Sequence, residues 1–212
     1  LAIGFYVSDD EASLASLRLH ANALDWVVPA LASVPTAQPV LNVASDANLM
    51  NVLGAIPSPP KLLPMVQNLD ADGWNGAGIT RIMSDPAASQ KLATAIAQMV
   101  KNQHGAGVVL DFEELSGGAM PGYARFLRLL RADLPKGSQL VLTAPAGDSN
   151  WDLGKLGRIA DHVIFMAYDQ HWQGGQPGPI AAQNWFVREV ERARAAIGPD
   201  KLIVALGNYG YD

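Results

Sequence analysis

The segment Gly107-Val-Val-Leu-Asp-Phe-Glu113 is a short apolar run that ends in two carboxylates. Its length and its branched residues are typical of a buried β-strand. Asp111 and Glu113 stand two positions apart, so both side chains point to the same face of that strand. We therefore expect a carboxylate pair at the end of an otherwise apolar strand.

Similar apolar runs recur along the chain and alternate with segments of helical spacing. Strands are predicted at 2–7, 26–31, 61–68, 105–113, 139–144, 161–169 and 201–208. Helices are predicted to begin at 9–11 and to cover 86–102, 121–133, 153–159 and 181–197. Residues 73–79 are predicted to form a loop, and 35–60 give no firm assignment. This alternation predicts a parallel sheet covered by helices on both faces.

Two architectures fit such a sheet, a doubly wound open sheet and a (β/α)8 barrel. No glycine-rich phosphate-binding pattern follows any strand, which disfavours the nucleotide-binding version. Polar side chains stand instead at several strand ends, where barrel enzymes carry their catalytic groups: Asn68, Asp111, Glu113, Tyr168, Asp169, Asn208 and Tyr209. We predict one domain over 1–212, a (β/α)8 TIM-type barrel of the α/β class, truncated after its seventh strand.

Composition excludes several functional classes. The 212 residues are 49% hydrophobic and 17% charged, with a net charge of −5, which is too apolar for a disordered chain and disfavours nucleic acid as a partner. There is no cysteine, and the four histidines have no metal-ligand spacing, so we predict neither a metal nor a cofactor. No apolar stretch reaches the ~18 residues of a membrane span. No secretory leader is recognisable, and we expect the chain to be a domain of a larger protein.

The carboxylate pair has two interpretations. Two close carboxylates raise the pKa of one of them, which keeps that group protonated as an acid near neutral pH. The alternative is that Asp111 and Glu113 are ordinary polar residues where a strand meets a loop, since structural networks also perturb carboxylates.

Several motifs of the chain, beginning with Gly107-Val-Val-Leu-Asp-Phe-Glu113, resemble those of glycoside hydrolase family 18, the chitinase family. Its fourth-strand signature is D-G-x-D-x-D-x-E, and the spore-cortex and cell-wall branch often has D-G-V-N-I-D-F-E. Phe165-Met-Ala-Tyr-Asp169 is similar to the family's M-x-Y-D. The segment from His171 to Pro179 and the closing Tyr209-Gly-Tyr-Asp212 also resemble that branch. These motifs occur in the expected order and span most of the chain.

The resemblance implies hydrolysis of β-linked N-acetylated glycans, chitin-like or peptidoglycan-like, by a retaining, substrate-assisted mechanism. Glu113 would protonate the glycosidic oxygen while the acetamide carbonyl of the substrate attacks the anomeric carbon. Asp111 would orient that acetamide, Tyr168 would hydrogen-bond to it, and Asp169 would lie near the same subsite.

Two departures from the family pattern weaken this expectation. The first two aspartates of the signature fall on Ala106 and Val109. Valine cannot hydrogen-bond to Asp111, which would need another partner such as water, Tyr168 or Glu113. The family's eighth strand, which carries a tryptophan at the floor of the cleavage subsite, is also expected beyond Asp212.

Further residues are candidates for substrate binding. Trp172 follows the sixth strand and could stack on a sugar ring. Asn68 ends the third strand, Tyr6 would face the barrel interior if Gly4 does, and Tyr209 follows the seventh strand.

Trp151 is a further candidate for stacking, and Trp74 could either contact substrate or belong to the core. Trp26 and Trp185 are predicted to be core residues. His171 could contact substrate or be solvated.

The sequence thus predicts a glycoside hydrolase that acts on an N-acetylated oligo- or polysaccharide. The rival is a glycan-binding barrel that kept the cleft and lost turnover, which Val109 favours and the retained Glu113 disfavours. The expected location is extracytoplasmic or in the cell envelope, with other domains of a larger chain as further partners and no membrane insertion by this segment.

Overall fold

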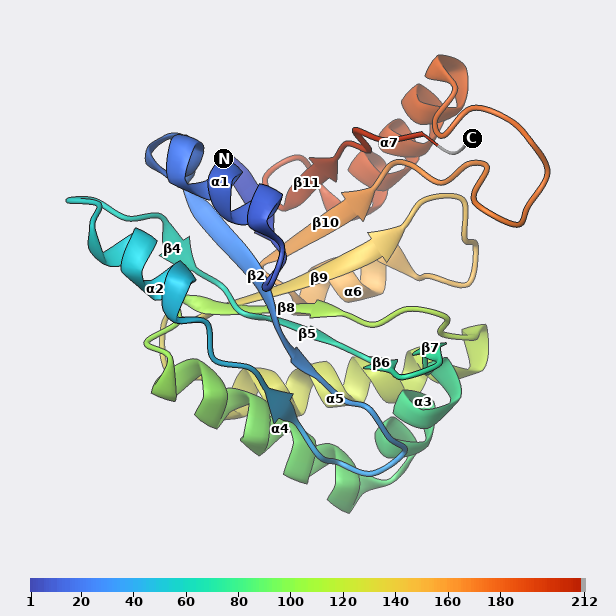
Figure 1. Cartoon of the computed structure of the whole chain (residues 1–212). Coiled ribbons are helices and arrows are strands. Elements are labelled where there is room, and N and C mark those ends of the chain that lie inside the picture. The colour runs from blue at the N-terminus through green and yellow to red at the C-terminus, as the bar shows by residue number, and fades with distance from the viewer. Residues whose placement is uncertain (211–212) are drawn as a thin grey trace.

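The computed structural model describes residues 1–210, and Tyr211 and Asp212 lie outside the described part of the chain. Seven parallel strands lie side by side in the order of the sequence, and most of them can be followed in Figure 1. They are β1 (Ile3–Tyr6), β2 (Trp26–Ser33), β5 (Met65–Gln67), β8 (Gly107–Asp111), β9 (Gln139–Pro145), β10 (His162–Met166) and β11 (Leu202–Ala205). Two short strands, β3 (Asn42–Val43) and β4 (Lys61–Leu62), also pair with β2. The predicted barrel-type sheet is confirmed.

β1 and β11 are the two ends of this series of strands. Among residues 1–210, no ladder of hydrogen bonds joins them. A cavity of about 300 Å³ is instead lined by Ile3 and Phe5 from β1 and by Ile203 and Ala205 from β11. The described sheet is therefore a half-barrel that is open between β1 and β11, as the truncated barrel of the sequence analysis requires.

Helices follow the strands and cover the outer side of the sheet. They are α1 (Glu11–His20), α2 (Ala47–Gly54), α3 (Gly76–Ser84), α4 (Pro86–Asn102), α5 (Met120–Asp133), α6 (Leu153–Ile159) and α7 (Gln183–Ile197), with 3-10 turns at Ala21–Ala23 and Gly117–Ala119. Asp10, Asp46 and Asp85 begin α1, α2 and α4, because each carboxylate accepts backbone N–H groups of the first turn. In Figure 1, α3, α4 and α5 lie together on one side of the sheet.

The strands divide the apolar core into an inner and an outer part. The inner core fills the concave side and consists of Trp26, Val28, Leu63, Met65, Val109, Val141 and Ile164. The alternate residues Val108, Leu110 and Phe112 pack outward, under the helices. Successive side chains of β8 therefore alternate between the two faces, and Val109 and Asp111 lie on the inner face, as predicted.

Two segments differ from the sequence prediction. Residues 73–79 were predicted to be a loop, but Asn75 caps α3 there by accepting the N–H of Gly78. A short hairpin of β6 (Leu69–Asp70) and β7 (Gly73–Trp74) precedes this helix. The unassigned segment 35–60 contains β3 and α2. Gly76 and Gly78 lie in the first turn of α3, and proline and asparagine are frequent over 35–60, so the sequence of each segment resembles that of a loop.

Candidate active site

The inner face of β8 ends in Asp111, whose side chain is only 8% exposed. Gln67, on β5, donates from Nε2 to Asp111 Oδ2 at 2.9 Å. Thr143, on β9, donates from Oγ1 to Asp111 Oδ1 at 2.7 Å. Burial raises the pKa of Asp111, and the hydrogen bonds from Thr143 and Gln67 oppose that rise because they stabilise the carboxylate.

These partners correct the sequence analysis, which named water, Tyr168 or Glu113 for the side chain of Asp111. Gln67 and Thr143 were missed as functional residues. Gln67 stands level with Asp111 in the register of β5 and β8. This register could have indicated Gln67, but it depends on which strands are neighbours, which a single sequence does not show.

Glu113 lies two residues beyond Asp111 and is partly buried. Its pKa is raised to about 7, first by burial, then by the negative charge of Asp111, and then by the charges of Glu114, Asp169 and Asp148. A carboxyl group with such a pKa is half protonated near neutral pH, which suits a general acid.

The backbone at Glu113 is held by Asn68, the residue that follows β5. Asn68 Nδ2 donates to the carbonyl of Glu113 at 3.0 Å, and the N–H of Glu113 donates to Asn68 Oδ1 at 2.8 Å. The next residue, Glu114, has a φ of 57°, so the chain turns sharply directly after Glu113. A Cβ at Gly76 would lie 2.1 Å from the carbonyl oxygen of Glu114, so only glycine lets α3 approach this turn.

Asn68 was predicted to contact substrate, and the structure assigns it another position. Its side chain is 0% exposed, and both ends of its amide are engaged by the main chain of Glu113. The prediction placed Asn68 at the correct end of its strand but gave it the wrong contact, because it could not anticipate that an asparagine amide pairs with a neighbouring backbone.

Tyr6 was also predicted to line the interior, and this prediction is wrong. Its side chain, 3% exposed, packs among Leu17, Leu31 and Leu49 on the helix side of the sheet. Its hydroxyl donates to Asp46 Oδ2 at 2.8 Å, and burial, followed by this bond, raises its pKa to about 12. The alternation along β1 is offset by one residue from our assumption, so Phe5 rather than Tyr6 faces the concave side.

A cleft of about 360 Å³ opens beside the carboxylate pair. It is lined by Trp74, Asp111, Glu113, Pro145, Ala146, Met166, Tyr168 and Asp169. The predicted residues Asp111, Glu113, Tyr168 and Asp169 thus share one cavity, although they come from two different strands. Burial, followed by the charge of Asp111, raises the pKa of Tyr168 to about 12, so its hydroxyl is a proton donor at neutral pH.

The remaining predicted residues, Tyr209 and Trp172, are not among those that line this cleft. Tyr209 donates its hydroxyl to Asp169 Oδ1 at 2.7 Å and packs edge-on against Tyr168, with ring centroids 5.8 Å apart. Trp172 is 61% exposed and does not line the cleft. His171 is exposed, and its Nδ1 lies 2.9 Å from the carbonyl of Gln176, within the same loop.

The tryptophans of undecided role now have positions. Trp74, on β7, lines the cleft with Glu113. Trp26 belongs to the inner core, and Trp151, 4% exposed, packs edge-on against Tyr123 in the outer core. Trp26 and Trp151 are both buried, so neither indole can stack on a sugar ring.

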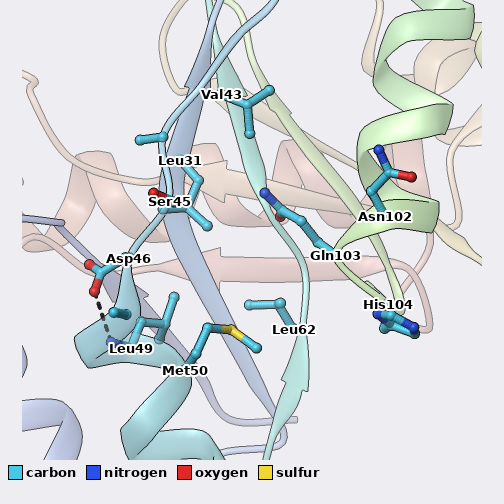
Figure 2. A pocket seen from close by; sticks show the side chains of 12 residues that line it. Leu31, Val43, Ser45, Asp46, Leu49, Met50, Leu62, Asn102, Gln103 and His104 are labelled. Carbon is cyan, nitrogen blue, oxygen red and sulfur yellow. Dashed lines mark hydrogen bonds between the residues drawn. The ribbon is translucent and has the colours of Figure 1, made fainter.

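A second cavity, of about 450 Å³, has no lining residue in common with the cleft. Figure 2 shows its apolar wall, formed by Leu31, Val43, Leu49, Met50 and Leu62, facing the polar end of α4 at Asn102, Gln103 and His104. Leu31 and Leu49 belong to the core on the helix side of the sheet, so this cavity opens on the outer surface rather than on the concave side.

The described residues contain no group of three or more histidine, aspartate or glutamate side chains placed to hold a metal ion. Within residues 1–210, no helix has both the length and the apolar character that crossing a bilayer requires.

Comparison with known proteins gives the same family as the sequence motifs. The family model for glycosyl hydrolases family 18 matches residues 69–212. A Bacillus subtilis protein provisionally named a sporulation-specific glycosylase is 30% identical over 158 residues, 71% of this chain and 38% of its own length. The cortical fragment-lytic enzyme of Bacillus anthracis is 25% identical over 182 residues, 82% of this chain and 40% of its own. The chain thus spans about two fifths of the length of these relatives.

Solved structures show the same fold. The spore cortex-lytic enzyme SleL of Bacillus cereus superposes with a TM-score of 0.84 over 96% of this chain and 49% of that structure, at 20% identity. A chitinase of Chromobacterium violaceum gives a TM-score of 0.82 over 96% of this chain and 67% of that structure, at 22% identity. The family model covers more than half of the sequence and includes every residue that lines the cleft. The chain therefore belongs to glycosyl hydrolases family 18.

Proposed function

We propose that this chain hydrolyses β-glycosidic bonds in N-acetylated glycans of the chitin or peptidoglycan type, by a retaining, substrate-assisted mechanism. The observation that carries the proposal is the pair of carboxylates at the cleft. Asp111 is buried between two hydrogen-bond donors, and Glu113 beside it has a pKa of about 7. The pKa of each carboxyl group is raised, but within residues 1–210 only Asp111 has hydrogen bonds that oppose the rise, which suits Asp111 to the role of anion and Glu113 to that of acid.

Glu113 is the proposed general acid. It donates its proton to the glycosidic oxygen as the bond to the anomeric carbon breaks, and the resulting carboxylate later accepts a proton from the water that completes hydrolysis. Glu113 is neutral below a pH of about 7. The acid form is lost as pH rises through that value, so kcat/KM falls on the alkaline side of about pH 7.

The nucleophile in this proposal is the carbonyl oxygen of the substrate's own 2-acetamido group. It attacks the anomeric carbon and forms a cyclic oxazolinium intermediate, which water opens with net retention. Asp111 accepts the acetamide N–H and stabilises the developing positive charge. Tyr168, whose hydroxyl remains protonated at neutral pH, donates to the acetamide oxygen. Asp169, anchored by Tyr209, borders the same subsite.

Substrate binding is proposed to use the aromatic residues around the cleft. The indole of Trp74 offers an apolar face in the same cavity as Glu113, and sugar C–H faces stack well on such rings. Trp172, exposed in the loop after β10, is the proposed contact for a sugar unit outside the cleft. The acetamide requirement restricts substrates to N-acetylated sugars at the cleavage point.

A glycan-binding module without turnover is the second candidate, and the apolar residue at 109 is the observation that favours it. Val109 is 0% exposed within the inner core and offers no hydrogen bond to Asp111. The side-chain donors Gln67 and Thr143 weaken this alternative, because they supply Asp111 with the polar contacts that Val109 lacks.

The proposed site of action is outside the cytoplasm or in the cell envelope, where such glycans are found. One relative is named a secreted chitinase, of Penicillium expansum, and is 27% identical over 62% of this chain. The cortical fragment-lytic enzymes support the same class of location by their name.

The test is hydrolysis of N-acetylglucosamine oligomers followed by NMR at the anomeric carbon. We expect the first product to have the β configuration, and we expect oligomers of glucosamine, which lack the acetyl group, to remain intact. Equal cleavage of both substrates would exclude participation by the acetamide. Binding of N-acetylglucosamine oligomers without any cleavage would favour the binding module instead.

A further inference from the structure

Three side chains form a polar row across the inner face of the sheet. Gln67 is the register partner of Asp111 on β5. Thr143 follows Leu142, the register partner of Leu110, and so stands level with Asp111 on β9. The carboxylate of Asp111 therefore has a donor on each side, from the two strands that flank β8.

The layer directly below this row is apolar. Val109 is flanked by Met65 on β5 and Val141 on β9, and all three belong to the inner core. No polar side chain in this layer can reach Asp111 from below. Its side-chain hydrogen bonds come instead from the neighbouring strands, at its own level.

The two hydrogen bonds divide the two oxygens of Asp111 between them. Gln67 binds Oδ2 at 2.9 Å, and the hydroxyl of Thr143 lies 2.7 Å from Oδ1 and 3.3 Å from the carbonyl of Leu110. The single proton of Thr143 belongs with the carboxylate, because that contact is shorter and its acceptor carries more charge. Each carboxylate oxygen has a second lone pair, so Asp111 can still accept a hydrogen bond from substrate.

We propose that Gln67 and Thr143 are positioning residues that hold Asp111 as an oriented anion from the sides, in place of a polar partner at position 109. This inference rests on the proposed function, in which Asp111 receives the acetamide N–H. Two fixed donors prevent the carboxylate from rotating towards Glu113, so its free lone pairs point into the cleft before substrate arrives. The cost of reorganisation is then met when the protein folds rather than during each turnover.

The charges around Asp111 make these donors necessary. The titratable groups that interact with Asp111 are Glu113, beyond the end of β8, Tyr168, beyond β10, and Tyr123, on α5. Glu113 in turn feels Glu114, Asp169 and Asp148. All of these are acidic or neutral, so among the interactions of the described residues no cation offsets the charge of Asp111. Neutral donors are what stabilise it.

Loss of either donor has a defined effect on titration. Burial already raises the pKa of Asp111, and the bonds from Thr143 and Gln67 lower it. Removal of a donor therefore raises the pKa of Asp111 further, so Asp111 becomes protonated at a higher pH than in the wild type. The active form requires an ionised Asp111 and a protonated Glu113. Because Asp111 ionises at a higher pH in such a variant, the acid limb of its pH–activity profile moves to higher pH.

The test uses near-isosteric substitutions at both positions. Thr143→Val and Gln67→Met remove the donors at similar volume, and Thr143→Ser keeps the hydroxyl. Thr94→Val is the matched control. Thr94 lies on the exposed side of α4, and its Oγ1 also donates to a carboxylate at 2.7 Å, that of Asp133 at the end of α5. The carboxyl carbons of Asp111 and Glu113 are titrated by NMR in the absence of substrate, and kcat/KM is measured against pH with N-acetylglucosamine oligomers.

We expect Thr143→Val and Gln67→Met to move the titration of Asp111 and the acid limb to higher pH and to lower kcat/KM at neutral pH about tenfold, the scale of one oriented hydrogen bond. Thr143→Ser should restore both properties, and Thr94→Val should change neither. An unmoved Asp111 titration in both folded variants, or a Thr143→Ser variant that behaves like Thr143→Val, overturns the inference. If the wild type does not hydrolyse the oligomers, the proposed function fails, while the NMR titration still decides the role of Gln67 and Thr143.

Discussion

Replacement of Glu113 by glutamine should make the protein more stable at alkaline pH. Burial and the nearby negative charges, Asp111 first, raise the pKa of Glu113 from 4.5 to about 7, so ionisation costs more free energy in the folded state than in the unfolded state. The wild type therefore loses free energy of unfolding as pH rises from about 4.5 to about 7. At ~1.4 kcal/mol for each unit of pKa difference, the loss approaches about 3 kcal/mol above pH 7. Glutamine has no charge to bury and avoids this loss.

Urea unfolding of wild type and Glu113→Gln at pH 4 and pH 8 measures the effect. We expect similar free energies of unfolding at pH 4 and a difference of about 3 kcal/mol in favour of Glu113→Gln at pH 8. Glu191→Gln, on the exposed side of α7, controls for the loss of one formal charge. If the difference between wild type and Glu113→Gln is the same at both pH values, Glu113 has no raised pKa and the reasoning fails.

Three further substitutions test the surroundings of the pair. Val109→Asn places an amide in the inner core, although Asp111 already has two donors. We expect a loss of about 1–3 kcal/mol in unfolding free energy and no gain in turnover, whereas a tenfold gain in turnover would show that Asp111 is poorly held. Asn68→Leu removes both hydrogen bonds to the main chain of Glu113. It should lower the free energy of unfolding in urea by about 2–3 kcal/mol and abolish most of the hydrolytic rate, whereas unchanged turnover would mean that Asn68 does not position the acid. Tyr6→Phe removes the hydrogen bond to Asp46 and should lower the free energy of unfolding in urea by about 1.5 kcal/mol without affecting hydrolysis. Reduced hydrolysis would mean that Tyr6 does contribute to the active site.

Much of the fold could be predicted from the sequence, because its strands are short, nearly continuous apolar runs that alternate with segments of helical spacing. Along β8, Val109 and Asp111 lie on the inner face and Leu110 and Phe112 on the outer face, as the alternation predicted. The cleft residues Asp111, Glu113, Tyr168 and Asp169 were also identified, because each stands at the carboxyl end of a strand or directly after it.

The errors have a common physical origin in side-chain direction and strand neighbours. Tyr6 was placed on the wrong face because four residues of β1 are too few to fix the alternation. Asn68 was assigned to substrate because no local pattern shows that its amide pairs with the backbone of Glu113. Gln67 and Thr143 were missed because their contact with Asp111 depends on lateral register, which arises only when β5, β8 and β9 assemble.

Whether Glu113 is the acid of a hydrolase is decided by a paired measurement on the wild type and Glu113→Gln. Release of reducing ends from N-acetylglucosamine oligomers is followed for wild type and Glu113→Gln, with binding of the same oligomers measured by calorimetry on both proteins. We predict that the wild type releases reducing ends, and that Glu113→Gln binds as well as the wild type but turns over about 10²–10⁴-fold more slowly. Wild-type turnover in the Glu113→Gln variant would contradict the account.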